Sequence, residues 1–130
     1  MAKFSDYLET ALLNATLRGI SYTAPSTVYV ALYTTDPTDA DVGSEVVGGG
    51  YARQPITFSA PVDGNANSNV DVVFAVATAT WGTITHIGLR DAATGGNLLY
   101  HIELSSANQK TINADDQLKI GAGDLTVILD

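Results

Sequence analysis

Apolar residues follow a helical period at the start of the chain. Four of them recur at the i, i+3, i+4, i+7 spacing that places side chains on one face of an α-helix: Leu8, Ala11, Leu12 and Ala15. Ser5 is a suitable N-cap, and Gly19 can end the helix because glycine readily adopts the left-handed conformation of a helix C-terminus. Residues 1–20 are therefore predicted to form a helix or arm. A helix this short is marginal alone in water, so its apolar face must pack on this domain or on a neighbouring chain.

Beyond Pro25 the hydrophobic period changes to two. The segment 27–34 (TVYVALYT) alternates between two sets of β-forming side chains. Similar short runs, separated by turn residues, predict further strands at 51–58, 70–76, 84–90, 97–104, 117–120 and 125–129. About seven to eight short strands without intervening helices predict an all-β domain over residues 21–130. We expect an antiparallel β-sandwich of the jelly-roll kind, preceded by one N-terminal α-helix.

The most regular segment is 81–104, WGTITHIGLRDAATGGNLLYHIEL, which predicts a β-hairpin. With a turn at 91–96, Leu89 faces Leu98 and Ile87 faces Tyr100 across an apolar face. A slip of one residue would turn that face into solvent.

The opposite face of this hairpin is predicted to be polar. In the same register His86 lies directly opposite His101, with Glu103 on the diagonal. Two imidazoles and one carboxylate could bind a metal ion, although most protein metal sites use at least three well-placed ligands. Protonated histidines could instead make a pH-sensitive contact with Glu103. The interpretation we adopt is that these are surface or interface side chains. Gly88 between them favours close approach by another backbone or chain.

Composition narrows the choice of function. The chain has 130 residues, 45% of them hydrophobic, and a formal net charge of −8. Such a chain is one globular domain, and its negative field argues against nucleic acid as a partner. Cysteine is absent, which excludes disulfides and thiolate metal sites. No apolar run approaches the ~20 residues of a membrane span, so no membrane partner is expected. The N-terminus lacks the apolar core of a signal peptide, which predicts assembly in a cytoplasm.

Motifs for catalysis or cofactor binding are missing from the sequence. Gly48-Gly49-Gly50 precedes a predicted strand rather than a helix, so it lacks the helix N-terminus that binds phosphate. No serine sits in a nucleophile-elbow motif. The acidic loop after Tyr33 could supply oxygen ligands to calcium, but its spacing is not that of an EF-hand: Asp36, Asp39, Asp41 and Glu45. We therefore expect no catalytic residue, no metal and no cofactor, with an exposed acidic loop.

Five segments, in order along nearly the whole chain, resemble a family of small structural proteins of tailed bacteriophages. They are FSDYLETALLN, APSTVYVALYTTDPTDA, GSEVVGGGYARQPITF, ATATWGTITHIGLRDAATGGNLLYHIEL and AGDLTVILD. Members of this family are labelled phage tail-fibre or virion structural proteins. The resemblance implies a non-enzymatic virion protein, assembled in the cytoplasm of a bacterial host. A homotrimer is implied by the resemblance alone.

Size decides which virion role we expect. The chain has neither the rod-like repeats nor the heptads of a long fibre. We therefore expect a capsid decoration (cement) protein on the outer surface of the head, bound to the major capsid protein and clamping neighbouring shell subunits. The alternative is a tail-fibre or receptor-binding module, and a third class is a carbohydrate-binding sandwich. The residues expected at the interface are Leu8, Leu12, Tyr22, Tyr51, Arg53, His86, Arg90, Leu99 and His101.

Overall fold

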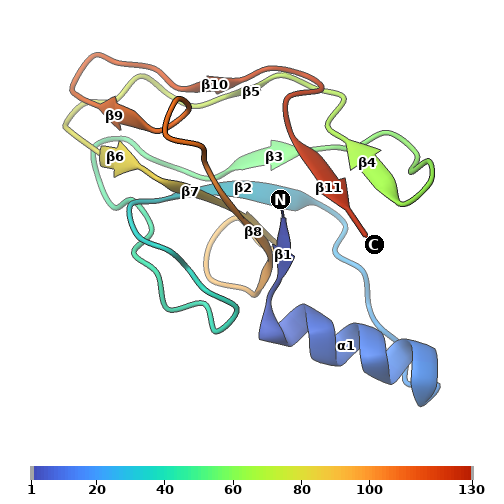
Figure 1. Ribbon diagram of the computed structural model, residues 1–130. Helices are drawn as coiled ribbons and strands as arrows, with labels where there is room; N and C mark the ends of the chain where they lie inside the picture. The colour runs from blue at the N-terminus through green and yellow to red at the C-terminus, as the bar shows by residue number, and fades with distance from the viewer. Residues whose placement is uncertain (1, 130) are drawn as a thin grey trace.

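The structure is a computed structural model that describes residues 2–129. In this part the chain forms one helix, α1 (Asp6–Leu17), and eleven short strands (Figure 1). The strands are β1 (Lys3–Phe4), β2 (Val28–Tyr33), β3 (Gln54–Ile56), β4 (Asn65–Asn67), β5 (Val72–Val73), β6 (Gly82–Ile84), β7 (His86–Arg90), β8 (Leu98–Glu103), β9 (Lys110–Ile112), β10 (Lys119–Ile120) and β11 (Thr126–Ile128).

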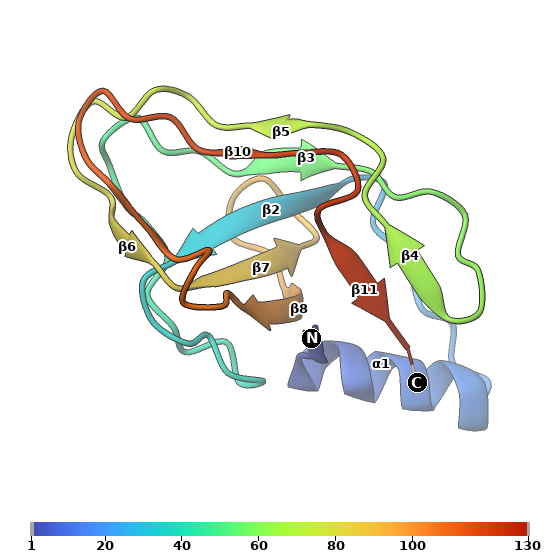
Figure 2. The ribbon, with the colours of Figure 1, turned by 45° about the horizontal axis from the view of Figure 1, so that its top comes forward.

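One five-stranded sheet organises the fold. Its strand order is β1-β8-β7-β2-β3, and every pairing is antiparallel. Three two-stranded ribbons, β10-β5, β11-β4 and β6-β9, cover one side of the sheet. Helix α1 and the loop after β2 lie on the other side in both views (Figures 1 and 2). The predicted class, all-β and antiparallel with one N-terminal helix, is confirmed. The second layer is divided into ribbons. The strands outnumber the prediction because the short strands β1, β4 and β9 were not predicted, and the run predicted at 84–90 is preceded by a separate strand, β6.

The two edge strands of the sheet are shorter than the three strands at its centre. One edge is β1, with two residues paired to β8. The other is β3, whose middle residue is Pro55. Proline has no backbone N–H and is confined in sheets mainly to edge strands, which accounts for the position of β3.

The main hydrophobic core lies between the sheet and the ribbons. Alternation along β2 sends Val30 and Leu32 into this core. Trp81 is buried there, and its Nε1 donates a hydrogen bond to the backbone oxygen of Gly49 at 2.9 Å. Tyr51 packs edge-on against Trp81, with ring centres 5.5 Å apart. Tyr51, expected at an interface, is instead half-buried, because its ring joins an aromatic cluster at the core.

Helix α1 begins and ends where the sequence predicts. The Ser5 hydroxyl accepts a hydrogen bond from the backbone N–H of Leu8 at 3.1 Å, and Gly19 has a φ of +65° just beyond the helix. The helix is attached mainly by its first turn. Ser5 donates its backbone N–H to the oxygen of Leu99, and Leu8 is 3% exposed. Leu13 and Leu17 face solvent. In residues 2–129 no helix is long and apolar enough to cross a membrane.

The predicted hairpin exists, but its register differs by two residues. Ile87 pairs with Ile102 and Leu89 with Tyr100, rather than with Tyr100 and Leu98. A two-residue shift preserves the faces, so these four side chains still lie toward the core. An irregularity between Leu89 and Arg90 then brings Leu98 to the opposite face, beside Gly88. His86 consequently lies opposite Glu103, and His101 lies opposite Gly88, so the predicted direct pairing of the two histidines is wrong.

Candidate functional site

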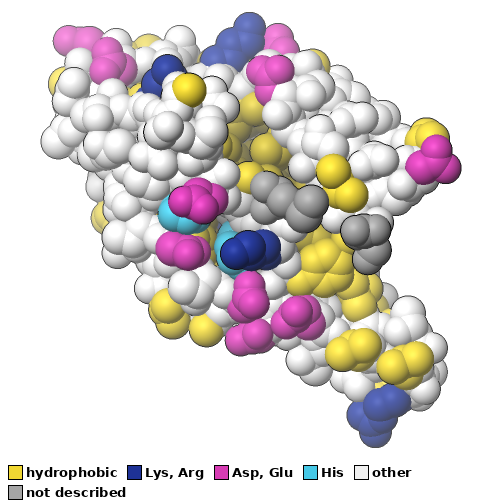
Figure 3. Space-filling view, in the orientation of Figure 1, with side chains coloured by type: hydrophobic (Ala, Val, Ile, Leu, Met, Phe, Trp, Pro, Cys, Tyr) yellow, Lys and Arg dark blue, Asp and Glu magenta, His cyan; other side chains and the backbone are white. Residues whose placement is uncertain are grey.

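The polar face of the sheet is buried. We use this name for the side of β2, β7 and β8 that carries Tyr33, His86, Gly88, Arg90, Leu98 and His101. His86, Arg90 and His101 are only 9%, 7% and 5% exposed. The acidic loop, residues 36–41, lies over them, and Figure 3 shows acidic side chains bordering the small visible area of histidine. The expectation that these side chains are at the surface is wrong, because the chain's own loop covers them.

Arg90 makes the strongest contact with this loop. Its guanidinium forms a two-pronged ion pair with Asp41, with N–O distances of 2.7 and 2.9 Å. It also donates to the Tyr33 hydroxyl at 2.8 Å and to the backbone oxygen of Gly96 at 3.0 Å. Burial by itself lowers the pKa of Arg90, but the bonds to Asp41 and Tyr33 outweigh it and raise the pKa. The arginine is thus a permanently charged link between sheet, loop and hairpin turn.

Two acids of the same loop lie against the histidines. His101 Nε2 lies 2.6 Å from Asp39 Oδ1, and the backbone oxygen of Asp39 accepts from the N–H of Asp6 at the start of α1. Asp36 lies between the imidazoles. Its Oδ1 is 3.8 Å from His86 Nε2 and 3.9 Å from His101 Nδ1. The acidic loop therefore joins β7, β8 and the helix.

A second ion pair, between Glu45 and Arg53, lies next to the polar face of the sheet. Glu45 accepts two hydrogen bonds from Arg53, each at 2.8 Å, and one from the Tyr51 hydroxyl at 2.6 Å. Arg53 also donates to the backbone oxygens of Ala92 and Gly95 in the hairpin turn. Burial raises the pKa of Glu45, but the bonds from Arg53 and Tyr51 more than offset it and hold the pKa below its usual value. Burial and Glu45 raise the pKa of Tyr51, which keeps its hydroxyl protonated.

This lowered pKa predicts how Glu45 stabilises the protein. Its contribution is present above the ordinary pKa of a glutamate and is lost as the pH falls through the lower folded-state pKa. We expect Glu45→Gln to lower the free energy of unfolding by about 1–3 kcal/mol at pH 7. The difference from wild type should shrink toward pH 3. Urea titrations of both proteins at the two pH values measure it. Glu103→Gln, which removes an exposed carboxylate, should cost less than about 0.5 kcal/mol at pH 7. A pH-independent cost for Glu45→Gln would contradict the linkage.

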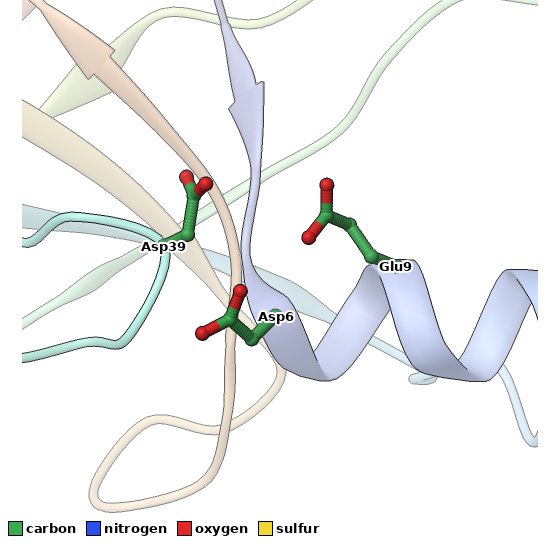
Figure 4. A group of neighbouring side chains, drawn as sticks. All are labelled: Asp6, Glu9 and Asp39. Atoms are coloured by element: carbon green, nitrogen blue, oxygen red, sulfur yellow. The ribbon is translucent and has the colours of Figure 1, made fainter.

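Three exposed carboxylates gather where α1 meets the acidic loop. Oxygens of Asp6, Glu9 and Asp39 lie within 4.8 Å of one another (Figure 4). Oxygen ligands suit calcium, but exposed acids of this kind are common without an ion. The calcium cage considered from the sequence is not assembled, because Asp41 pairs with Arg90 and Glu45 pairs with Arg53.

Tyr22 lies in a shallow groove between α1 and the segment that follows it. The groove has a volume of about 610 Å³. It is lined by Asp6, Tyr7, Thr10, Ala11, Asn14, Ile20, Ser21, Tyr22 and Thr23. Partial burial, and then the proximity of Tyr7 and Asp91, raise the pKa of the Tyr22 hydroxyl. Tyr22 is thus the predicted interface residue that borders an open concave surface.

The predicted interface residues do not form one surface. Leu8, Leu99, His86, Arg90 and His101 are buried within the chain, while Tyr51 and Arg53 belong to the Glu45 cluster. Leu12 is half-buried on α1. The sequence analysis missed the acids that pair with the polar face. Charge balance was the available signal, because this face carries two imidazoles and a guanidinium against the single carboxylate of Glu103, and an acidic loop follows β2.

Comparison with known proteins gives one finding. A family model described as Podophage GP4 fiber I protein gp80 matches residues 3–128 of this chain. No curated protein matches it.

Proposed function

This chain belongs to the family of the podophage GP4 fiber I protein gp80, a family of bacteriophage virion structural proteins, and on that premise we propose that it is a non-enzymatic subunit of a phage tail fibre. The observation that carries the proposal is the extent of the match, residues 3–128, which leaves almost none of the chain for another function. The description of the family names a fibre protein, so the tail-fibre role is preferred here to the capsid role expected from size.

The use of the polar side chains supports a structural role. Arg90, His101 and Arg53 are each bonded to a carboxylate of the same chain. These contacts hold loops against the sheet, so they stabilise a shape. A subunit that transmits force in a virion benefits from loops fixed in this way, since mobile loops transmit no load.

The exposed side of α1 is the surface we propose for contact with other virion proteins, including further copies of this chain in the expected trimer. Leu13 and Leu17 are 58% and 77% exposed on consecutive turns, and Ile20 follows at 46%. Large apolar side chains grouped in this way mark protein interfaces. Leu12 and Tyr22 lie on the same segment and remain predicted interface residues.

Capsid decoration is the second candidate. It is favoured by the compact domain, which lacks the repeated rod of a fibre shaft, and its partner would be the major capsid protein. A small terminal or connecting module of a fibre has the same format, so compactness alone does not choose between the two roles.

Deletion of the gene from the phage distinguishes the candidates. For a fibre subunit, we expect heads that withstand heating as wild type does, with adsorption to host cells reduced at least tenfold. Gold labelling of an epitope-tagged copy should mark the tail. Particles that adsorb normally but release DNA on mild heating, with gold over the head, would reject the fibre role and support decoration.

A further inference from the structure

We propose that the groove between α1 and residues 20–23 is a binding site for a short neutral oligosaccharide, whose sugar rings pack on Tyr7 and Tyr22. The site goes beyond the fibre role and does not depend on it, because it is defined by the lining of the groove alone. A capsid decoration protein with the same lining would bind the same ligand.

The groove has one wall from the helix and one from the chain that follows it. The helix contributes a single stripe of side chains at the i, i+3, i+4, i+7 spacing: Tyr7, Thr10, Ala11 and Asn14. Gly19, with a φ of +65°, then turns the chain back, and the backbone N–H of Ile20 donates to the oxygen of Asn14 at 3.1 Å. Residues 20–23 are thereby held beside the stripe and form the second wall.

The lining combines aromatic rings with polar side chains. Tyr7 is 41% exposed and Tyr22 is half-buried, so each ring presents surface to the groove. Hydroxyl groups come from Thr10, Ser21 and Thr23. A sugar ring has a matching structure, because its C–H groups form a face that packs on an aromatic ring, while the hydroxyls at its edge donate and accept hydrogen bonds. The lining therefore suits a saccharide better than a wholly apolar ligand.

The charge of the lining selects a neutral sugar. Among the described residues, Asp6 is the charged side chain that lines the groove. Arg18 lies near Asn14, whose Oδ1 accepts a hydrogen bond from the guanidinium at 3.1 Å. An acidic sugar or a phosphate would meet the carboxylate of Asp6, in a chain whose net charge is −8. The hydroxyls of a neutral sugar can instead donate to that carboxylate, and such charge-assisted hydrogen bonds are strong.

Most polar side chains of the groove are not used by the protein itself. In residues 2–23, side-chain hydrogen bonds are formed by Ser5, Asn14, Thr16 and Arg18. Of these four residues only Asn14 lines the groove, so the other polar groups of the lining can bond a ligand. Burial, and then the proximity of Tyr7, raise the pKa of Tyr22, so its hydroxyl keeps its proton and can donate.

The size of the groove fits a disaccharide or a trisaccharide. Its volume of about 610 Å³ falls within the roughly 300–1,000 Å³ of small-molecule sites. Because the groove is shallow, one side of a bound sugar stays in water, and we expect a Kd of about 1 mM.

The test is a ¹H–¹⁵N correlation titration of the full chain with maltose, lactose and N,N′-diacetylchitobiose, each used separately. We expect at least one of these neutral disaccharides to shift the backbone resonances of residues 7–14 and 20–23, with a Kd of about 1 mM, while those of β2 stay in place. Tyr22→Ala should weaken this binding about tenfold or more, because it removes the ring. Tyr22→Phe keeps the ring and should weaken it less than about threefold. Unchanged β2 resonances in each variant show that the fold is kept.

Leu13→Ala is the matched control. Leu13 is 58% exposed on the same helix but does not line the groove, so this change should alter the affinity by less than about twofold. Leu13 also belongs to the surface proposed above for contact with other virion proteins. A loss of virion assembly in Leu13→Ala therefore bears on the fibre role, whereas a loss of sugar binding in Tyr22→Ala bears on the groove.

Three results would overturn the proposal. The first is the absence of shifts with all three disaccharides at concentrations up to about 50 mM, well above the expected Kd. The second is sugar binding that Tyr22→Ala leaves unchanged. The third is that penta-arginine shifts the resonances of the groove while the sugars do not. Tyrosine rings and a carboxylate also attract cations, so that result would make the groove a docking surface for a basic protein segment.

Discussion

Replacing Arg90 by methionine is expected to lower the free energy of unfolding by about 3 kcal/mol. Methionine keeps much of the volume of the side chain but removes the ion pair with Asp41 and the donor to Tyr33, whose side chain is fully buried. Removing one partner of a buried ion pair costs roughly 3–5 kcal/mol. We expect the lower end, because the Asp41 side chain is 33% exposed and can turn to water. Urea unfolding followed by Trp81 fluorescence measures the change.

The same change should free the acidic loop before the whole protein unfolds. The backbone N–H of Val42 donates to Pro37 at 2.7 Å, so its hydrogen-exchange protection reports on the closed loop. In Arg90→Met this protection should fall more than that of the β2 amides. Arg18→Met is the matched control: Arg18 is exposed and bonds only its own helix neighbour Asn14, so its loss should cost less than about 0.5 kcal/mol. Equal effects of the two substitutions would show that the Asp41 pair contributes nothing.

Gly88→Val is the second substitution with a large expected effect. It should lower the free energy of unfolding by about 3 kcal/mol, through steric overlap rather than through loss of a charge. A Cβ at this position would lie 2.6 Å from Cε2 of Tyr33 and 2.8 Å from Cδ1 of Leu98, both buried. Extra atoms in a packed interior force neighbouring side chains off their rotamers, at a cost of about 1–3 kcal/mol. Valine adds three carbon atoms, so we expect the upper end. The denaturant midpoint should be lower for Gly88→Ala than for wild type, and lower still for Gly88→Val.

A double-mutant cycle identifies the source of the strain. If the Tyr33 ring is the obstacle, Gly88→Ala should be less destabilising in a Tyr33→Leu background, with a coupling of about 1 kcal/mol. Strict additivity would contradict the role of Tyr33. The glycine was expected to mark a close neighbour, and the structure identifies that neighbour as a side chain of the same molecule rather than another chain.

Features that depend only on residues close together in the sequence were predictable from it. The cap at Ser5 and the termination at Gly19 are local, and both ends of α1 were placed correctly. The alternation over 27–34 likewise predicted the strand β2. By contrast, Asn65–Asn67 forms a strand through pairing with β11, although asparagine has low strand propensity. No periodicity within so short a segment could reveal that pairing.

The buried ion pairs could not be found from local patterns. Asp41 and Arg90 are 49 positions apart, and Asp39 and His101 are 62 apart. A sequence pattern gives the face on which a strand residue lies, but it does not say whether water or a loop covers that face. The hairpin register failed for a related reason. Leu98 was assigned by assuming regular pairing beyond the turn, and the irregularity at Leu89–Arg90 changes its side.

The short edges of the sheet bear on aggregation. An open strand edge recruits strands from other copies and can seed amyloid. Here β1 offers only two residues, and Pro55 removes a donor from β3. A strand from a second copy would find too few main-chain groups to pair with at either end. The two edges of the five-stranded sheet are therefore poor templates for a strand of another copy.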